Sequence, residues 1–107
     1  MENNQYNTNG LFDYYKNQVF KILGLFESKD VNGYRHGMKI RSEMVNLPEQ
    51  FQKLYSDYRF NIVISKMDIL IEELKLMDGE HQFVKNHVME SLNLLQGIKE
   101  GLQDENV

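Results

Sequence analysis

The segment FNIVISKMDILIEELKLM, residues 60–77, sets the architecture of this chain. It contains no Gly or Pro, and its main apolar residues recur at alternating steps of three and four, the spacing of a helix that buries one side. These residues are Phe60, Val63, Met67, Leu70, Leu74 and Met77, and Ile64 and Ile71 widen the same side.

Three apolar residues of this segment do not fit its main stripe: Ile62, Ile69 and Leu76. They are spaced seven apart and, at about 100° per residue, lie roughly opposite that stripe. A helix on the surface of a small protein needs only one apolar side. The sequence therefore predicts a helix that makes contacts on two opposite sides.

Length and composition are those of one ordinary globular domain. The chain has 107 residues, of which 41% are hydrophobic and 26% are charged, so we do not expect it to be disordered. We assign the domain to residues 10–103. A flexible lead-in is expected over residues 1–9 and a frayed tail over residues 104–107.

The composition also bears on the cellular compartment. No apolar run approaches the roughly 18 residues that a membrane helix needs, and the polar start MENNQYNTNG does not resemble a secretory signal. The chain has no Cys, which excludes disulfides, thiolate zinc sites and cysteine nucleophiles. These features predict a cytoplasmic protein.

Helical periodicity covers both ends of the chain. A first helix is predicted from about Gly10 to Ser28, capped by Thr8 or Asn9, and a last helix from about Glu80 to Leu102. The expected inward residues are Leu11, Phe12, Tyr15, Val19, Ile22, Leu23 and Phe26 in the first helix, and Val84, Val88, Leu92, Leu95, Ile98 and Leu102 in the last.

A second helix is plausible from Tyr34 to about Val45, after a turn over Lys29 to Gly33. Its apolar stripe is poorer, because Gly37 weakens it and Ile40 points away from the other apolar residues. The expected inward residues are Tyr34, Met38, Met44 and Val45.

Residues 48–77 admit two interpretations. One is a single long helix from Pro48, whose apolar side would switch across the helix near Arg59. The favoured one is a break at Ser56 and Asp57, both good caps, which lets each half face one core. Gly79 is expected to take the left-handed conformation that ends this part. The fold class predicted is all-α, an antiparallel bundle of four to five helices with a long central helix or helix pair.

Residues with catalytic chemistry are present but not arranged for it. His81 and His87 are six apart, which places them on different sides of one helix and rules out a paired metal clasp. We expect His87 to be partly buried with a hydrogen-bond partner, and Ser91 to bond a backbone carbonyl one turn back. The chain has no Glu-x-x-His pairs for a di-metal bundle. No cofactor, metal or small-molecule substrate is implied, and we do not expect an enzyme.

Charge is unevenly distributed along the chain. Residues 34–66 hold six Lys or Arg against three acids, whereas residues 71–107 hold three against eight. The net charge of −4 argues against broad phosphate-backbone binding. A weak nucleic-acid contact is still one hypothesis, and it would use Arg35, Lys39, Arg41, Lys53 and Arg59.

The sequence favours a small protein that acts by protein–protein contact as a regulator, adaptor or inhibitor, and that self-associates. The apolar anchor would be Ile62, Ile69 and Leu76 with Tyr55 and Tyr58, and the basic residues Arg35, Lys39 and Arg41 would orient the partner by charge. An alternative is an immunity-type or antitoxin-type protein that neutralises one cognate protein. Residue chemistry does not separate the two.

Overall fold

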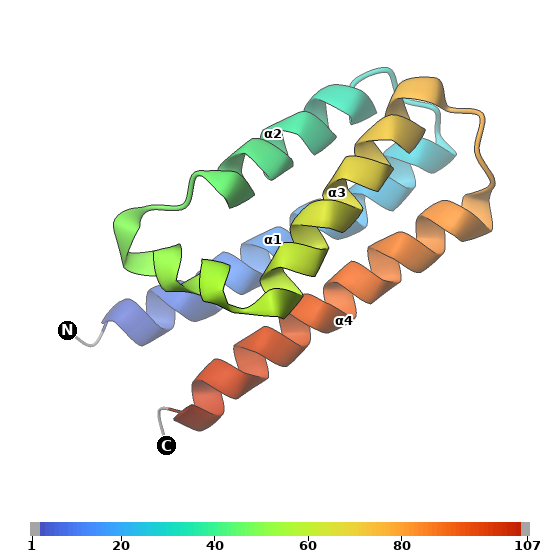
Figure 1. Cartoon of the computed structure of the whole chain (residues 1–107). Coiled ribbons are helices and arrows are strands. Elements are labelled where there is room, and N and C mark those ends of the chain that lie inside the picture. The colour runs from blue at the N-terminus through green and yellow to red at the C-terminus, as the bar shows by residue number, and fades with distance from the viewer. Residues whose placement is uncertain (1–2, 106–107) are drawn as a thin grey trace.

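The computed structural model describes residues 3–105, and the side chains of residues 10–102. This part of the chain forms four α-helices and one 3₁₀-helix, with no strand (Figure 1). The helices are α1 (Asn3–Glu27), α2 (Gly33–Val45), η1 (Glu49–Ser56), α3 (Tyr58–Leu76) and α4 (His81–Glu105). The predicted all-α bundle is therefore confirmed.

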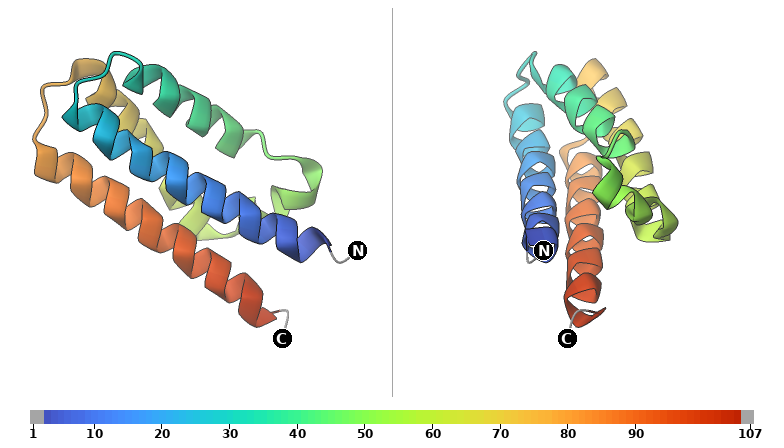
Figure 2. Two further views of the ribbon diagram at one scale, coloured as in Figure 1. Left: turned by 180° about the vertical axis from the view of Figure 1, so that it is seen from behind. Right: turned by 90° about the vertical axis from the view of Figure 1, so that its left-hand side faces the viewer.

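The four long helices run up and down beside one another. Figure 2 shows α1 next to both α2 and α4, while α3 lies between α2 and α4 and diagonally across from α1. The short η1 crosses the end of the bundle near the two termini (Figure 1). None of the helices in the described part of the chain is long and apolar enough to cross a membrane.

The core is made by the predicted stripes of α1, α3 and α4. In α3 the fully buried residues include Phe60, Val63, Met67 and Leu70, as the spacing predicts. The other predicted core residues of α1 and α4 are buried or pack partly buried against the core. Burying each large side chain of this kind contributes about 1.5–3 kcal/mol, so these stripes hold the bundle together.

The predicted break before α3 is confirmed. Asp57 is the N-cap of α3, and its Oδ1 accepts a hydrogen bond from the backbone N–H of Arg59 at 2.9 Å. Just before it, the Tyr55 hydroxyl donates to the Met44 carbonyl at 2.7 Å and accepts from the Leu47 N–H at 3.0 Å. The cap re-phases the chain, and the bonds of Tyr55 tie η1 to the end of α2.

The inward face predicted for α2 is right for Met44 and for Tyr34, which packs partly buried against the core, and wrong for Met38 and Val45. The buried face of α2 is Gly33, Gly37, Ile40 and Met44, whereas Met38 and Val45 are exposed. The sequence predicts Gly33 in the turn before this helix and Gly37 as a weak point within it, but both belong to the packed face. A Cβ on Gly37 would lie 3.1 Å from side-chain atoms of both Ile71 and Leu74. Backbone of α2 therefore lies directly against α3, and this turns Ile40 inward.

Two predicted helix boundaries also need correction. Helix α1 begins at Asn3, so neither Thr8 nor Asn9 caps it, and most of the expected lead-in is helical. No Gly or Pro precedes Gly10, and a helix once nucleated extends at little cost. Helix α4 continues to Glu105, into the expected tail, because no Gly or Pro follows Gly101. Residues 1–2 and 106–107 lie outside the described part.

The end of α3 also differs from the prediction. Met77, not Gly79, takes the left-handed conformation, with φ of 57°. Its backbone N–H donates to the Glu73 carbonyl at 2.8 Å. The Met77 side chain packs against the core, which offsets the cost of positive φ in a residue with a side chain.

The close approach of α2 to α3 can be tested at its glycine. We predict that Gly37→Leu lowers the free energy of unfolding by about 3 kcal/mol, because a large side chain would force the helices apart. Gly24→Leu is the matched control, since a Cβ at Gly24 meets nothing within 4 Å. Leu is the better helix former, so this control should be neutral or stabilising. Urea denaturation measures both, and equal stability of the two variants would contradict the packing.

Candidate functional site

The outward side of α3 carries four exposed apolar residues in a row. Exposed fractions are 71% for Tyr58, 38% for Ile62, 37% for Ile69 and 60% for Leu76. At about 100° per residue the four lie within roughly 40° of one another and opposite the buried residues of α3. The second apolar line predicted for this helix is therefore at the surface of the single chain.

The neighbouring helices add apolar side chains to this row. On α2, Met38 and Val45 are exposed and lie close to the helical side of Arg41, which forms an ion pair with Asp68 of α3. On α4, exposed Phe83 packs its ring against His87 with centroids 4.6 Å apart. Since His87 contacts Lys66 of α3, Phe83 lies on the α3 side of α4.

We call this surface the α3 face. Its residues are Met38, Val45, Tyr58, Ile62, Ile69, Leu76 and Phe83. It spans the outer side of α3 and the adjacent edges of α2 and α4.

Charged pairs lie on both flanks of α3, between the exposed row and the apolar residues of the neighbouring helices. Towards α2, Arg41 is paired with Asp68. Towards α4, Lys66 Nζ lies 2.6 Å from Glu90 Oε1 and 3.3 Å from His87 Nδ1. The hydrogen bond from Lys66 lowers the pKa of Glu90 below its ordinary value.

Some of the predicted binding residues lie elsewhere. Tyr55 belongs to η1 and is half-buried, and its hydroxyl is bonded to the backbone of Met44 in α2 and of Leu47 in the following loop. Lys39 pairs with Glu43 at 3.9 Å, and Glu43 accepts a hydrogen bond from Tyr14 of α1. Lys39 therefore lies towards α1, away from the α3 face. Arg35 is exposed on α2, and of the three basic residues predicted to orient a partner only Arg41 contacts α3.

The cations proposed for nucleic-acid contact are mostly engaged within the chain. The Arg59 side chain donates two hydrogen bonds to the Asp57 carboxylate, at 3.0 and 2.8 Å. These bonds lower the pKa of Asp57. The Arg59 guanidinium also lies close to Gly97 and Gly101 of α4. With Arg41 and Lys39 in ion pairs, the arrangement gives little free positive charge for a phosphate backbone.

An open hollow of about 490 Å³ lies between the end of η1 and α4. Its lining includes Lys53, Tyr58, Arg59, Ile98 and Gly101. The charged groups are one lysine and the Arg59–Asp57 pair, so the hollow has no obvious catalytic pair.

The three histidines have ordinary structural partners. His36 Nε2 lies 2.9 Å from the Gln18 carbonyl, and His81 pairs with Glu27 across α1 and α4. His87 is partly buried against Lys66, and the Ser91 hydroxyl donates to the His87 carbonyl at 2.8 Å. Both predictions for His87 and Ser91 are confirmed. In the described residues no three side chains of metal-ligating type gather.

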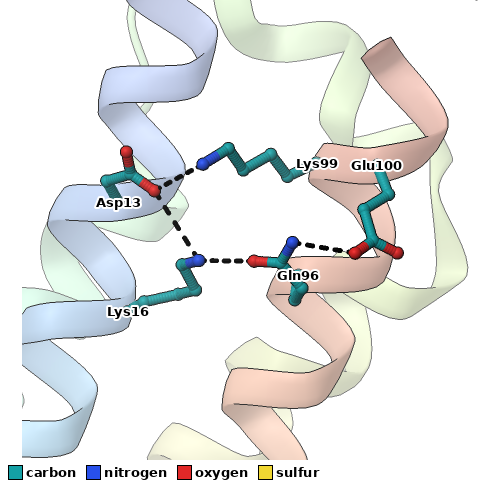
Figure 3. Close-up of polar contacts among 5 residues, drawn as sticks. All are labelled: Asp13, Lys16, Gln96, Lys99 and Glu100. Carbon is teal, nitrogen blue, oxygen red and sulfur yellow. Dashed lines mark hydrogen bonds and ion pairs between the residues drawn. The ribbon is translucent and has the colours of Figure 1, made fainter. Parts of the chain in front are cut away.

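A polar cluster joins α1 to α4. Figure 3 shows Lys99 of α4 reaching Asp13 of α1, with Nζ 2.7 Å from Oδ1, and Lys16 contacting Asp13 and Gln96. Gln96 donates in turn to Glu100 at 2.9 Å. Every group has a partner of opposite charge or polarity, so the cluster fixes the register of the two helices. It carries no chemistry of its own.

Comparison with protein-family models, with curated proteins and with solved structures found no match to this chain. The site is therefore defined by its geometry.

The cluster between α1 and α4 gives a pH dependence whose sign follows from Asp13. The hydrogen bond from Lys99 is the main cause that lowers the pKa of Asp13 below its ordinary value of 3.8. A lowered folded-state pKa stabilises the fold above the unfolded value, and this contribution is lost as the pH falls through the folded value. We predict that Asp13→Asn loses less stability than wild type between pH 5 and about pH 2.

Urea denaturation at a series of pH values measures this difference. Asp13→Asn should be the less stable protein at pH 7 and should approach wild type in acid. Parallel stability curves for the two proteins across this range would show that the Asp13–Lys99 contact does not contribute.

Proposed function

We propose that this protein acts by protein–protein contact through the α3 face, and that it is not an enzyme. One observation carries the proposal. Of the eleven exposed large hydrophobic residues in the described part, seven belong to this face. Single exposed apolar residues are normal in soluble proteins, but a gathering of them on one side of the molecule usually marks a contact site.

The composition of the face suits an interface. Tyr58, Phe83 and Met38 are of the residue types enriched at interface cores, and Ile62 and Ile69 provide rigid branched surface between them. The pairs Arg41–Asp68 and Lys66–Glu90 place both signs of charge along the two flanks of α3, within the face. Charges at a contact surface orient a partner more than they add affinity.

The biological role within this class depends on the partner. A regulator, an adaptor or an inhibitor would all use the same face, and so would an immunity-type protein that covers one cognate protein. The proposal keeps the cytoplasmic location predicted from the sequence.

Substitution at the centre of the face tests the proposal. We predict that Ile69→Glu abolishes stable association, because a carboxylate buried without a partner costs several kcal/mol. Phe20→Glu is the matched control: Phe20 is 55% exposed on α1, outside the α3 face. Tagged proteins would be purified from the native host and their bound partners, including further copies of this chain, identified by native mass spectrometry.

Circular dichroism must show that both variants keep wild-type helicity. Loss of partners from Ile69→Glu and not from Phe20→Glu supports the proposal. If both variants retain the wild-type set of partners, or only Phe20→Glu loses them, the α3 face is not the functional surface.

A further inference from the structure

We infer that His87 is a pH-sensitive switch at the edge of the α3 face: its protonation in mild acid breaks its contact with Lys66 and releases Phe83. The switch consists of three side-chain contacts, which join Lys66 to His87, Lys66 to Glu90 and His87 to Phe83. The movement of Phe83 is a property of the single chain. Because Phe83 belongs to the α3 face, the effect of this movement on partners rests on the proposed function.

The contact between Lys66 and His87 defines which ring nitrogen carries the proton. Lys66 Nζ lies 3.3 Å from His87 Nδ1, and an ammonium group has hydrogens to donate but no lone pair with which to accept. His87 Nδ1 must therefore be the acceptor of this hydrogen bond. It follows that the folded chain at neutral pH holds a neutral imidazole with its proton on Nε2.

A second proton on the ring removes this hydrogen bond. Both nitrogens of an imidazolium are donors, so Nδ1–H would point at the ammonium of Lys66 and set one positive charge beside another. The Lys66 side chain is only 16% exposed, and partly buried charges are screened much less than exposed ones. Because histidine is the side chain whose charge ordinarily changes between pH 5 and pH 8, the contact is lost in mild acid.

The neighbouring charges decide which of the two side chains moves. Glu90 Oε1 accepts a hydrogen bond from Lys66 Nζ at 2.6 Å, and this bond lowers the pKa of Glu90, so the carboxylate stays ionised in mild acid and keeps the ammonium in place. Helix α1 contacts a different side of α4, where Lys99 reaches Asp13. The imidazolium is therefore the group that turns, and the acid within its reach on α4 is Glu90, three residues further on.

A turn of the imidazole changes the apolar surface beside it. The rings of Phe83 and His87 pack edge to face, with their centroids 4.6 Å apart, a geometry that stabilises aromatic pairs. Phe83 is 44% exposed, so its ring depends on few neighbours for its position. At neutral pH the neutral imidazole holds Phe83 in the α3 face, and in mild acid the ring of Phe83 is released.

Nuclear magnetic resonance of the purified chain tests each step. At pH 8 the ring-nitrogen shifts of His87 should show the Nε2–H form, and a nuclear Overhauser cross-peak should join the rings of His87 and Phe83. At pH 5 this cross-peak should be lost, while the signals of Val84 and Val88 in the core show that the fold is kept. Lys66→Met is the matched variant, because it keeps the apolar stem and removes the charge. Its cross-peak should persist at both pH values.

Either of two results in the wild-type chain would overturn the switch: a His87 ring with its proton on Nδ1 at pH 8, or a cross-peak that persists after His87 is protonated. Loss of the cross-peak in acid from Lys66→Met as well would overturn the role of Lys66.

The effect on partners is measured separately, by capture from the native host at pH 7.5 and at pH 5.5. Wild type should lose partner at the lower pH. His87→Gln should not, because its amide oxygen can accept the hydrogen bond from Lys66 and carries no charge at either pH. Equal capture by wild type at both pH values would overturn the regulation of the α3 face. That result is separable from failure of the proposed function, which is measured with Ile69→Glu at neutral pH.

Discussion

The structure depends on one constraint: α3 is apolar on two opposite sides, and a four-helix arrangement can bury only one of them. The side with Phe60, Val63 and Met67 lies fully in the core. The other side is left outward because α2 and α4 occupy the two flanks of α3, and α1 lies across the core from it. Hydrophobic burial thus decides the bundle and, by the same choice, leaves an apolar face in water.

Two local features fix which side of α3 points outward. Asp57 follows η1 and is the N-cap of α3. The apolar stripe of α3 can therefore point in a different direction from the apolar side of η1. Gly33 and Gly37 let the backbone of α2 lie against Ile71 and Leu74. Larger residues at these two positions would move α2 away from α3 and change which residues of α2 lie beside the exposed row. The positions of Met38 and Val45 beside the exposed row follow from this glycine contact.

Most of the fold could be predicted from periodicity, because the stripes of α1, α3 and α4 are long and regular. The cap at Asp57 was also predictable, since Asp has a specific chemistry at a helix start. The inward face of α2 was predictable only in part, because it is built partly from Gly33 and Gly37, which have no side chain to register as apolar. The start of α1 at Asn3 was missed because asparagines are read as caps and turn residues.

The candidate site was predictable only in part, because spacing along the sequence places residues of one helix but not the packing of separate helices. Ile62, Ile69 and Leu76 share one helix, so their common side follows from spacing alone. Phe83, Met38 and Val45 join them through the packing of separate helices, which no local pattern encodes. Tyr55 was assigned to the anchor by its position in the sequence, but its hydroxyl is bonded to Met44 and Leu47 of its own chain.

Side-chain solvent accessibility in the assembled protein tests the central claim most directly. Hydroxyl-radical labelling of the assembly isolated from the native host can be compared with labelling of dilute purified chain. If the α3 face is the contact surface, labelling of Tyr58, Ile69 and Leu76 falls in the assembly while that of Phe20 and Val31 is unchanged. Unchanged labelling of the α3 face, with protection at Phe20 instead, would contradict the account.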